Sequence, residues 1–189
     1  MPTEEKLQVR VRSRGFVDSA GIKQLMVERK TVSAADFSGQ TLDHFVSVGS
    51  TFKSCRFEGM RIEYACFGSG RKTSHYEDCS FDGTTIVAST PGYAKFVKCR
   101  FLNISITEFF GFNVSMVDCV FSGKLRKIVF YGADPTRRAW LWKKRNKFAG
   151  NDFSHARFSD VAFREHIDLS KQRLPNGWAP GGDPYQNVT

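Results

Sequence analysis

Long apolar runs are absent from this sequence. No stretch of about 18 apolar residues occurs, which is the shortest length that a membrane-spanning helix needs. Residues 1–30 also lack the apolar centre of a secretory signal peptide. We therefore expect a cytoplasmic protein with no membrane partner.

The common short motifs of enzymes are absent as well. There is no HExxH, no GxGxxG, no phosphate-binding P-loop and no GxSxG. The four histidines, His44, His75, His155 and His166, are scattered, and no feature of the sequence brings two acidic side chains together as in a glycosidase. We predict that the protein is not an enzyme and that it uses no cofactor.

What the sequence does contain is a large apolar residue at every fifth position. Three phases carry this period, over residues 37–67, 81–121 and 148–163. All but three of their positions hold a large apolar residue, although only 41% of the chain is hydrophobic. The exceptions, which we interpret as bulges or bends, are Ser47, Pro91 and Gly111.

A period of five fits neither a helix nor a flat strand. On an α-helix each step of five turns about 140°, so the apolar residues would scatter around the cylinder. On a strand, successive steps would alternate between the two faces. A chain that turns a corner every five residues keeps one side of each segment facing inward, and four such segments close a square coil. The sequence therefore predicts an all-β solenoid.

Small residues two positions before a phenylalanine support a coil of four such segments. They are Ala35, Cys55, Cys79, Cys99 and Cys119. Each interval between successive members equals four segments of five, except that the interval from Cys55 to Cys79 is four residues longer. The longer interval predicts a bulge of four residues in one coil, within the glycine- and serine-rich segment 68–74.

The cysteines of this pattern are interpreted as packing residues. Five cysteines are an odd number, and no CxxC pair of the kind found in zinc sites is present. Stacked coils would also place the thiols in a line rather than in a tetrahedron. We expect reduced thiols in the core rather than metal ligands. Cys66 lies one position outside the inward slot and should be the most accessible thiol.

The pattern resembles that of the pentapeptide-repeat family, in which Ala or Cys stands two residues before a central Leu or Phe. Ala-Asp-Phe-Ser-Gly at 35–39 and Asn-Asp-Phe-Ser-His-Ala-Arg-Phe at 151–158 match it closely. The resemblance implies a right-handed quadrilateral β-helix of about five to six coils, in a bacterial protein. It does not fix a function, because the family includes topoisomerase-protecting proteins, secreted effectors and members with no assigned role.

The repeat also sets the expected domain organisation. Residues 1–34 are expected to cap its N-terminal end, with an alternating strand at 6–12 and either a helix or a strand at 21–30. Residues 35–169 should form the β-helix, interrupted by a basic insertion at 122–147. Residues 170–189 read as an irregular C-terminal tail. Trp178 and Tyr185 are unusual in such a tail and indicate docking on a neighbour.

The insertion concentrates the positive charge of the chain. Nine Lys or Arg and one Asp lie between Lys124 and Lys147, which accounts for all but one unit of the net charge of +9. Basic residues alternate there with two tryptophans. The contact residues that we predict are Arg137, Arg138, Trp140, Trp142, Lys143, Lys144 and Arg145.

We predict a non-catalytic binding scaffold that engages a macromolecular partner through this insertion and the outer faces of the β-helix. Arg and Trp are frequent interface anchors, which favours an acidic protein over nucleic acid, although cations and stacking indoles suit both. The plainest alternative is a solvated loop whose tryptophans pack on the β-helix. Protection of DNA gyrase by imitation of duplex DNA requires an acidic surface, which this chain lacks. A symmetric homodimer is left open.

Overall fold

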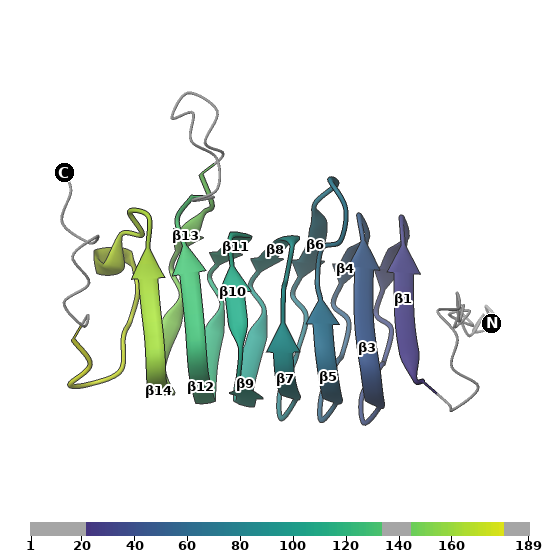
Figure 1. The fold of residues 1–189 in the computed structure, drawn as a ribbon, viewed down its shortest axis with the longest axis horizontal. Helices are drawn as coiled ribbons and strands as arrows, with labels where there is room; N and C mark the ends of the chain where they lie inside the picture. The colour runs from purple at the N-terminus through teal and green to yellow at the C-terminus, as the bar shows by residue number, and fades with distance from the viewer. Residues whose placement is uncertain (1–21, 134–144, 180–189) are drawn as a thin grey trace, which may run out of the picture.

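The computed structural model describes residues 22–133 and 145–179, whose strands pair in parallel and stack along one axis from β1 to β14 (Figure 1). The eight-stranded sheet contains β1 (Gln24–Glu28), β3 (Thr41–Val48), β5 (Arg61–Cys66), β7 (Thr85–Ser89), β9 (Arg100–Ile106), β10 (Phe109–Gly111), β12 (Val120–Tyr131) and β14 (Asp152–Arg164). The six-stranded sheet contains β2 (Thr31–Ser33), β4 (Thr51–Lys53), β6 (Ser74–Glu77), β8 (Tyr93–Val97), β11 (Asn113–Val117) and β13 (Phe148–Ala149). The predicted all-β, right-handed quadrilateral β-helix is confirmed, as a solenoid of about five turns.

Each coil has four faces, which we number in chain order by their inward-pointing central residues. Face 1 is centred on Leu42, Ile62, Ile86, Ile106, Leu125 and Phe158, and face 2 on Ser47, Phe67, Pro91, Gly111, Phe130 and Phe163. Face 3 is centred on Phe52, Tyr76, Phe96, Met116 and Phe148, and face 4 on Phe37, Phe57, Phe81, Phe101, Phe121 and Phe153. Faces 1 and 2 share the larger sheet, because strands such as β3 run through the corner between them.

The phenylalanines of face 4 form one continuous stack. From Phe37 to Phe153, successive ring centroids are 4.5 to 4.9 Å apart and the rings are nearly parallel. That spacing equals the distance between neighbouring strands, so each coil adds one ring to the stack. The predicted interior is confirmed: every position of the five-residue period is buried except Phe158, which is half-buried. Ser47, Pro91 and Gly111 also face inward, so their interpretation as bulges or bends was wrong.

Left-handed backbone conformations make many of the corners. They occur two residues after the central residue, as at Ser54 (φ 50°), Asp78 (φ 52°) and Lys98 (φ 53°), which follow face 3. Glycine serves the same purpose after face 4, and Gly123 is a special case because a Cβ there would collide with the carbonyl of Ile104. The five-residue period is therefore three extended residues and a turn.

The bulge expected at 68–74 is confirmed. Val46 pairs with Cys66, one regular coil further along the chain, whereas Thr51 pairs with His75, which lies four residues beyond a regular coil. The extra residues therefore lie between β5 and β6, where a loop projects from the stack (Figure 1). The rest of both coils remains in register.

The expected N-terminal cap is corrected. Residues 22–34 form the first three sides of a coil that Phe37 completes, because β1 pairs with β3 and β2 pairs with β4. Leu25, Val27 and Val32 are buried in the same core as the phenylalanines. Val32 and Val27 continue the five-residue period from Phe37 toward the N-terminus, but without its aromatic signature. Segment 21–30 contains a strand, and the strand expected at 6–12 lies outside the described residues.

The expected insertion at 122–147 is also corrected. Residues 122–131 belong to β12, in which Leu125, Ile128 and Phe130 are buried. The period is hidden there by a slip of one residue: Phe121 pairs with Phe101, but Leu125 pairs with Ile106. Four residues rather than five separate Phe121 from the next central residue. The excursion from the coil is therefore confined to the stretch between Tyr131 and Phe148.

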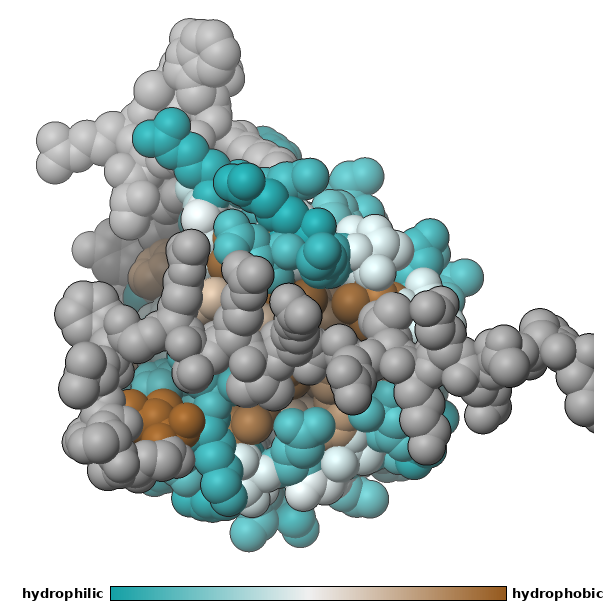
Figure 2. All heavy atoms as spheres, turned by 90° about the vertical axis from the view of Figure 1, so that its right-hand side faces the viewer, coloured by the Kyte–Doolittle hydropathy of each residue, from teal (hydrophilic) through white to brown (hydrophobic). Residues whose placement is uncertain are grey.

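The described part of the tail closes the C-terminal end of the stack. A 3-10 helix, η2 (Leu169–Lys171), precedes Gln172, which is buried and accepts a hydrogen bond from Asn151 Nδ2 at 2.9 Å. The indole of Trp178 packs edge-on against Phe158 and Phe163, with centroids 5.5 and 5.6 Å apart. The docking expected of Trp178 is confirmed. Figure 2 looks at the opposite end, where hydrophobic side chains lie inside the section and hydrophilic ones along its upper and lower rims.

Candidate partner-binding surface

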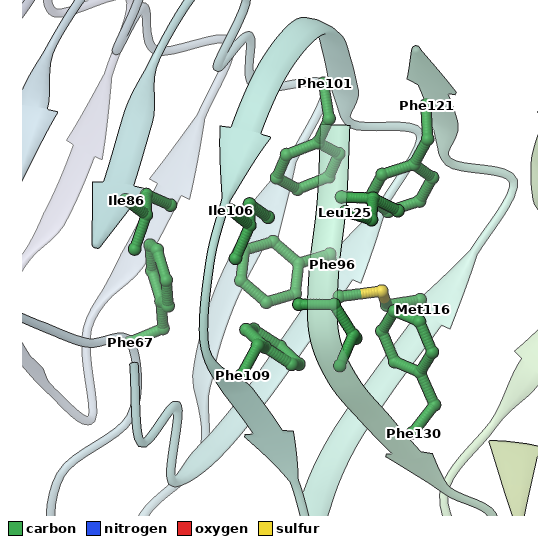
Figure 3. A pocket seen from close by; sticks show the side chains of 11 residues that line it. Phe67, Ile86, Phe96, Phe101, Ile106, Phe109, Met116, Phe121, Leu125 and Phe130 are labelled. Carbon is green, nitrogen blue, oxygen red and sulfur yellow. The ribbon is translucent and has the colours of Figure 1, made fainter. Parts of the chain in front are cut away.

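The part of the interior shown in Figure 3 contains no cavity large enough for a ligand. A void lies there among apolar side chains, including Phe67, Phe96, Phe109 and Met116 (Figure 3). Its volume is about 10 Å³, which is the space of a single water molecule at most. A void of this size is a packing defect where aromatic and aliphatic side chains meet, and it is too small to hold a ligand.

The four inward cysteines are chemically quiet. Their thiols are buried, and Cys55, Cys79 and Cys99 each contact a backbone carbonyl of the preceding coil at 3.4 to 3.6 Å. The interaction with Cys55 lowers the pKa of Cys79, but the interaction with Cys99 and burial outweigh it and raise that pKa to about 12. The neighbouring thiol and burial also raise the pKa of Cys55. The core role predicted for these residues is confirmed, and the raised pKa values of Cys55, Cys79 and Cys99 disfavour a nucleophilic thiolate near neutral pH.

Within residues 22–133 and 145–179, no three His, Cys, Asp or Glu side chains gather closely enough to hold an ion. The single helix of this part of the chain is the three-residue η2, so no helix described here has the length to cross a bilayer.

Several cations on the outer surface of the N-terminal coils form ion pairs. On face 4, Arg56 lies 3.3 Å from Asp36 and 2.8 Å from Glu58, and Arg100 pairs with Asp82. The Arg56 guanidinium and the Ser80 hydroxyl both hold the pKa of Glu58 below its ordinary value. Arg61 pairs with Glu63 on face 1 and Lys53 with Glu77 on face 3. Positive and negative charges are therefore balanced on this part of the surface.

The C-terminal coils carry cations without such partners. Lys124 and Arg126 project from β12 on face 1, and Arg157 projects from β14; all three are exposed. Lys124 and Arg157 occupy directly opposed positions on neighbouring strands. None of the three forms an ion pair with another residue of the described ranges, whereas nearby Lys127 lies 3.5 Å from Glu108. We call Lys124, Arg126 and Arg157 the basic patch.

Most of the contact residues predicted from the sequence lie outside the described residues. They are Arg137, Arg138, Trp140, Trp142, Lys143 and Lys144. Arg145 is exposed where the excursion rejoins the coil and forms an antiparallel bridge with Ala133. Lys124 and Arg126, which the sequence assigned to the insertion, are instead held rigidly on a strand. Arg157 was missed, because a single arginine inside a regular repeat gives no signal of its own.

Face 2, around the corner from the basic patch, has an apolar exterior. In the five coils from β3 to β12 neither of its two outward positions holds a charged residue. We call these residues the apolar strip: Val46, Val48, Cys66, Gly68, Thr90, Gly92, Phe110, Phe112, Val129 and Tyr131. Phe110 and Phe112 are 40% and 37% exposed. Sequence reasoning missed this surface, because it followed only the inward positions of the repeat.

A hollow opens in the apolar strip at its two glycines. Its volume is about 260 Å³, and it is lined by residues of three successive coils: Cys66, Gly68, Ser69, Gly70, Thr90, Gly92, Tyr93, Phe110, Phe112 and Asn113. Cys66 is half-buried while the other four thiols are buried, as the sequence predicted. The ring of Phe112 stacks on that of Tyr131 at 4.6 Å. Asn146 Nδ2 donates hydrogen bonds to the carbonyls of Phe112 (2.8 Å) and Tyr131 (2.7 Å), which ties the base of the excursion to this aromatic pair.

Together these features define a parallel β-solenoid with a balanced N-terminal part and a basic, partly apolar C-terminal part. No family model and no curated protein matches the chain. Among solved structures, a trypsin-treated form of QnrB1, described as a plasmid-mediated fluoroquinolone resistance protein, aligns with a TM-score of 0.21 and 14% sequence identity. The alignment covers 82% of this chain and 90% of that chain. Similarity at this level carries no argument, and the fold assignment stands on the strand pairing described above.

Proposed function

We propose that this protein is a non-catalytic binding scaffold of the pentapeptide-repeat type, and that its C-terminal coils bind an acidic protein. The five-residue period and the stacked coils support the family assignment. The scaffold role is supported by an interior filled with side chains and by thiols whose raised pKa keeps them unreactive. Its cytoplasmic location and bacterial origin are part of the same proposal.

The single observation that carries this proposal is that no residue of the basic patch forms an ion pair with another described residue. Two cations directly opposed on adjacent strands repel one another, which opposes folding. Arg56 and Arg61, at comparable outward positions in earlier coils, have acidic neighbours. Charges retained without compensation are expected where a partner supplies the opposite charge on binding.

The apolar strip favours a protein over nucleic acid as that partner. Interface cores between proteins are rich in aromatic and aliphatic side chains, with polar residues around them. The strip supplies exposed Phe110 and Phe112, Val129 lies beside Phe110 on the next coil, and the basic patch lies on the adjoining face. A nucleic acid would use the cations but would gain little from the aliphatic side chains. We include the excursion residues Arg137, Arg138, Trp140, Trp142, Lys143, Lys144 and Arg145 in the proposed contact surface.

The experiment compares two variants that remove equal charge from the two halves. In the patch variant Lys124, Arg126 and Arg157 become Ser; in the matched control the ion-paired Lys53, Arg56 and Arg61 become Ser. Binding of poly-glutamate, a DNA duplex and single-stranded RNA is measured over a salt series. We expect poly-glutamate to bind the wild type, with about tenfold weaker binding to the patch variant and nearly unchanged binding to the control.

Two results would reject parts of this proposal. Equal weakening in both variants would show that net charge alone governs binding and that the patch is not a site. Tighter binding of duplex or single-stranded nucleic acid than of poly-glutamate at the same salt, with a steeper salt dependence, would replace the acidic protein by a nucleic acid. A third variant, with Arg137, Arg138, Lys143, Lys144 and Arg145 changed to Ala, measures the share of the excursion.

A further inference from the structure

We propose that the hollow in the apolar strip receives one large apolar side chain from an acidic segment of the partner protein. The inference rests on the proposed function and makes it more specific, because it states which feature of the partner is recognised besides its charge. It is carried by the shape of the hollow, by the chemistry of its walls and by the lysines around it.

The hollow exists because two glycines occupy the same outward position in adjacent coils. Gly68 pairs with Gly92, while the coils on either side place Val48 and Phe112 at this position. A Cβ on Gly68 would collide with the backbone of Tyr93, and one on Gly92 would collide with the carbonyl of Gly68. The floor is therefore closely packed backbone of the solenoid, which gives a preformed site with little ordering cost on binding.

The walls of the hollow are apolar and the space is small. Phe110 and Phe112 form one side and the half-buried thiol of Cys66 lies on another, and no charged residue is among those that line it. Its volume of about 260 Å³ lies just below the range of about 300 to 1,000 Å³ that small-molecule sites occupy. One aromatic or large aliphatic side chain fits such a space, and an apolar anchor in a pocket is the usual centre of a protein interface.

The surroundings of the hollow select an acidic segment. Lys72 belongs to the loop that contributes Ser69 and Gly70 to the lining, and its side chain passes within 3.0 Å of the place where a Cβ of Gly49 would lie. Lys95 follows Tyr93 by two residues on β8. Neither lysine is ion-paired with any side chain in the described part of the chain. Carboxylates that flank the anchor on the partner would therefore meet two uncompensated cations.

The test begins with an unbiased set of ligands. The full-length protein is used to select binders from a library of random peptides, and a selected peptide is then titrated against variants by fluorescence anisotropy. Thr90→Trp fills the hollow from an exposed position, and Thr41→Trp places the same side chain on an exposed position of face 1 as the matched control. A variant with Lys72 and Lys95 changed to Ser removes these two charges near the hollow. Because Cys66 is the one thiol of the five that is not buried, its alkylation rate reports directly on occupancy.

The proposal expects selected peptides that combine acidic residues with one Trp, Phe or Leu. Their affinity should fall about tenfold or more in Thr90→Trp, by a smaller factor in the lysine variant and not in Thr41→Trp, and the peptide should slow alkylation of Cys66. Peptides without an apolar anchor, unchanged affinity in Thr90→Trp, an unprotected Cys66 or a selection that enriches nothing would each overturn it. If Thr90→Trp abolishes binding while the basic-patch variant does not, the hollow stands and the proposed role of the patch fails. The reverse pattern rejects the hollow alone.

Discussion

The N-terminal and C-terminal coils share one interior and differ on the outside. Residues 22–84 contain eight Lys or Arg and eight Asp or Glu, whereas residues 85–133 and 145–179 contain twelve and six. The phenylalanine stack of face 4 passes through both parts without a change in spacing. The interior of the repeat thus places no demand on the charge of the surface, and each half is free to evolve its own.

The difference places the proposed binding surface in the C-terminal coils. In the N-terminal coils, Arg56 lies between Asp36 and Glu58, an arrangement that serves the solenoid itself. In the C-terminal coils, Lys124 faces Arg157, an arrangement that does nothing for the solenoid. The excursion between Tyr131 and Phe148 and the exposed Phe110 and Phe112 occur in the same part. The opposed cations, the excursion and the exposed phenylalanines therefore all lie in the C-terminal coils.

The largest predicted effect tests whether the core is really common to both parts. Phe57 stacks between two rings at 4.9 and 4.8 Å, and Phe121 between two rings at 4.6 and 4.5 Å; both are 1% exposed. Because each substitution leaves the same kind of cavity, Phe57→Ala and Phe121→Ala should each lower the free energy of unfolding by about 3 to 5 kcal/mol. Urea unfolding measures both. If one variant loses less than about 1 kcal/mol, the two halves do not share a cooperative core.

The interior was predictable from the sequence because one geometric rule governs it. Every fifth residue must face the axis, and Phe, Leu and Ile are the residues that fill a coil. The period can therefore be recognised in the sequence wherever it is regular. It was missed at Val27 and Val32, where β-branched residues replace the aromatic ring. It was also missed at Leu125, where a slip of one residue beside Gly123 shifts the phase.

The candidate site was far less predictable, because outward positions obey no period. The charge of Lys124 and Arg126 was visible in the sequence, but its placement on a strand depended on seeing the slip. Arg157 joins them only because β14 stacks on β12 after the excursion has left the coil and returned. The hollow needs Gly68 beside Gly92, an alignment that depends on the bulge between β5 and β6. Contacts of this kind follow from register rather than from local pattern.

A smaller effect tests the contrast in charge. Lys124→Ser removes one of two like charges that face each other across β12 and β14, so it should leave stability unchanged or raise it by a few tenths of a kcal/mol. Arg56→Ser removes the ion pairs of Arg56 with Asp36 and Glu58 and should lower stability. Both are measured by thermal unfolding at low and high salt. Added salt should shrink the two changes, because it screens both interactions. Destabilisation by Lys124→Ser would mean that this lysine has a structural role.

The smallest predicted effect concerns two aspartates in equivalent positions of the repeat. Asp36 and Asp152 each accept a hydrogen bond at 2.9 Å from the backbone of the serine two residues further on, and each pairs with an arginine of the next coil. The hydrogen bonds with Ser38 and Ser154 are the main cause that lowers the pKa of each carboxyl in the folded state. The side chain of Asp152 is 21% exposed and that of Asp36 is 55% exposed, so solvent screens Asp36 more strongly.

Their effect on stability has a definite sign. A pKa that is lower in the folded than in the unfolded state gives stability that is present above the unfolded value, about 4, and lost as the pH falls through the folded value. We therefore expect the melting temperature to fall as the pH is lowered below about 4, and Asp152→Asn to reduce that fall more than Asp36→Asn does. Both variants should be less stable than the wild type at pH 7. Equal pH profiles for the wild type and Asp152→Asn would contradict this prediction, because they would show that the contacts of Asp152 with Ser154 and Arg173 give no pH-dependent stability.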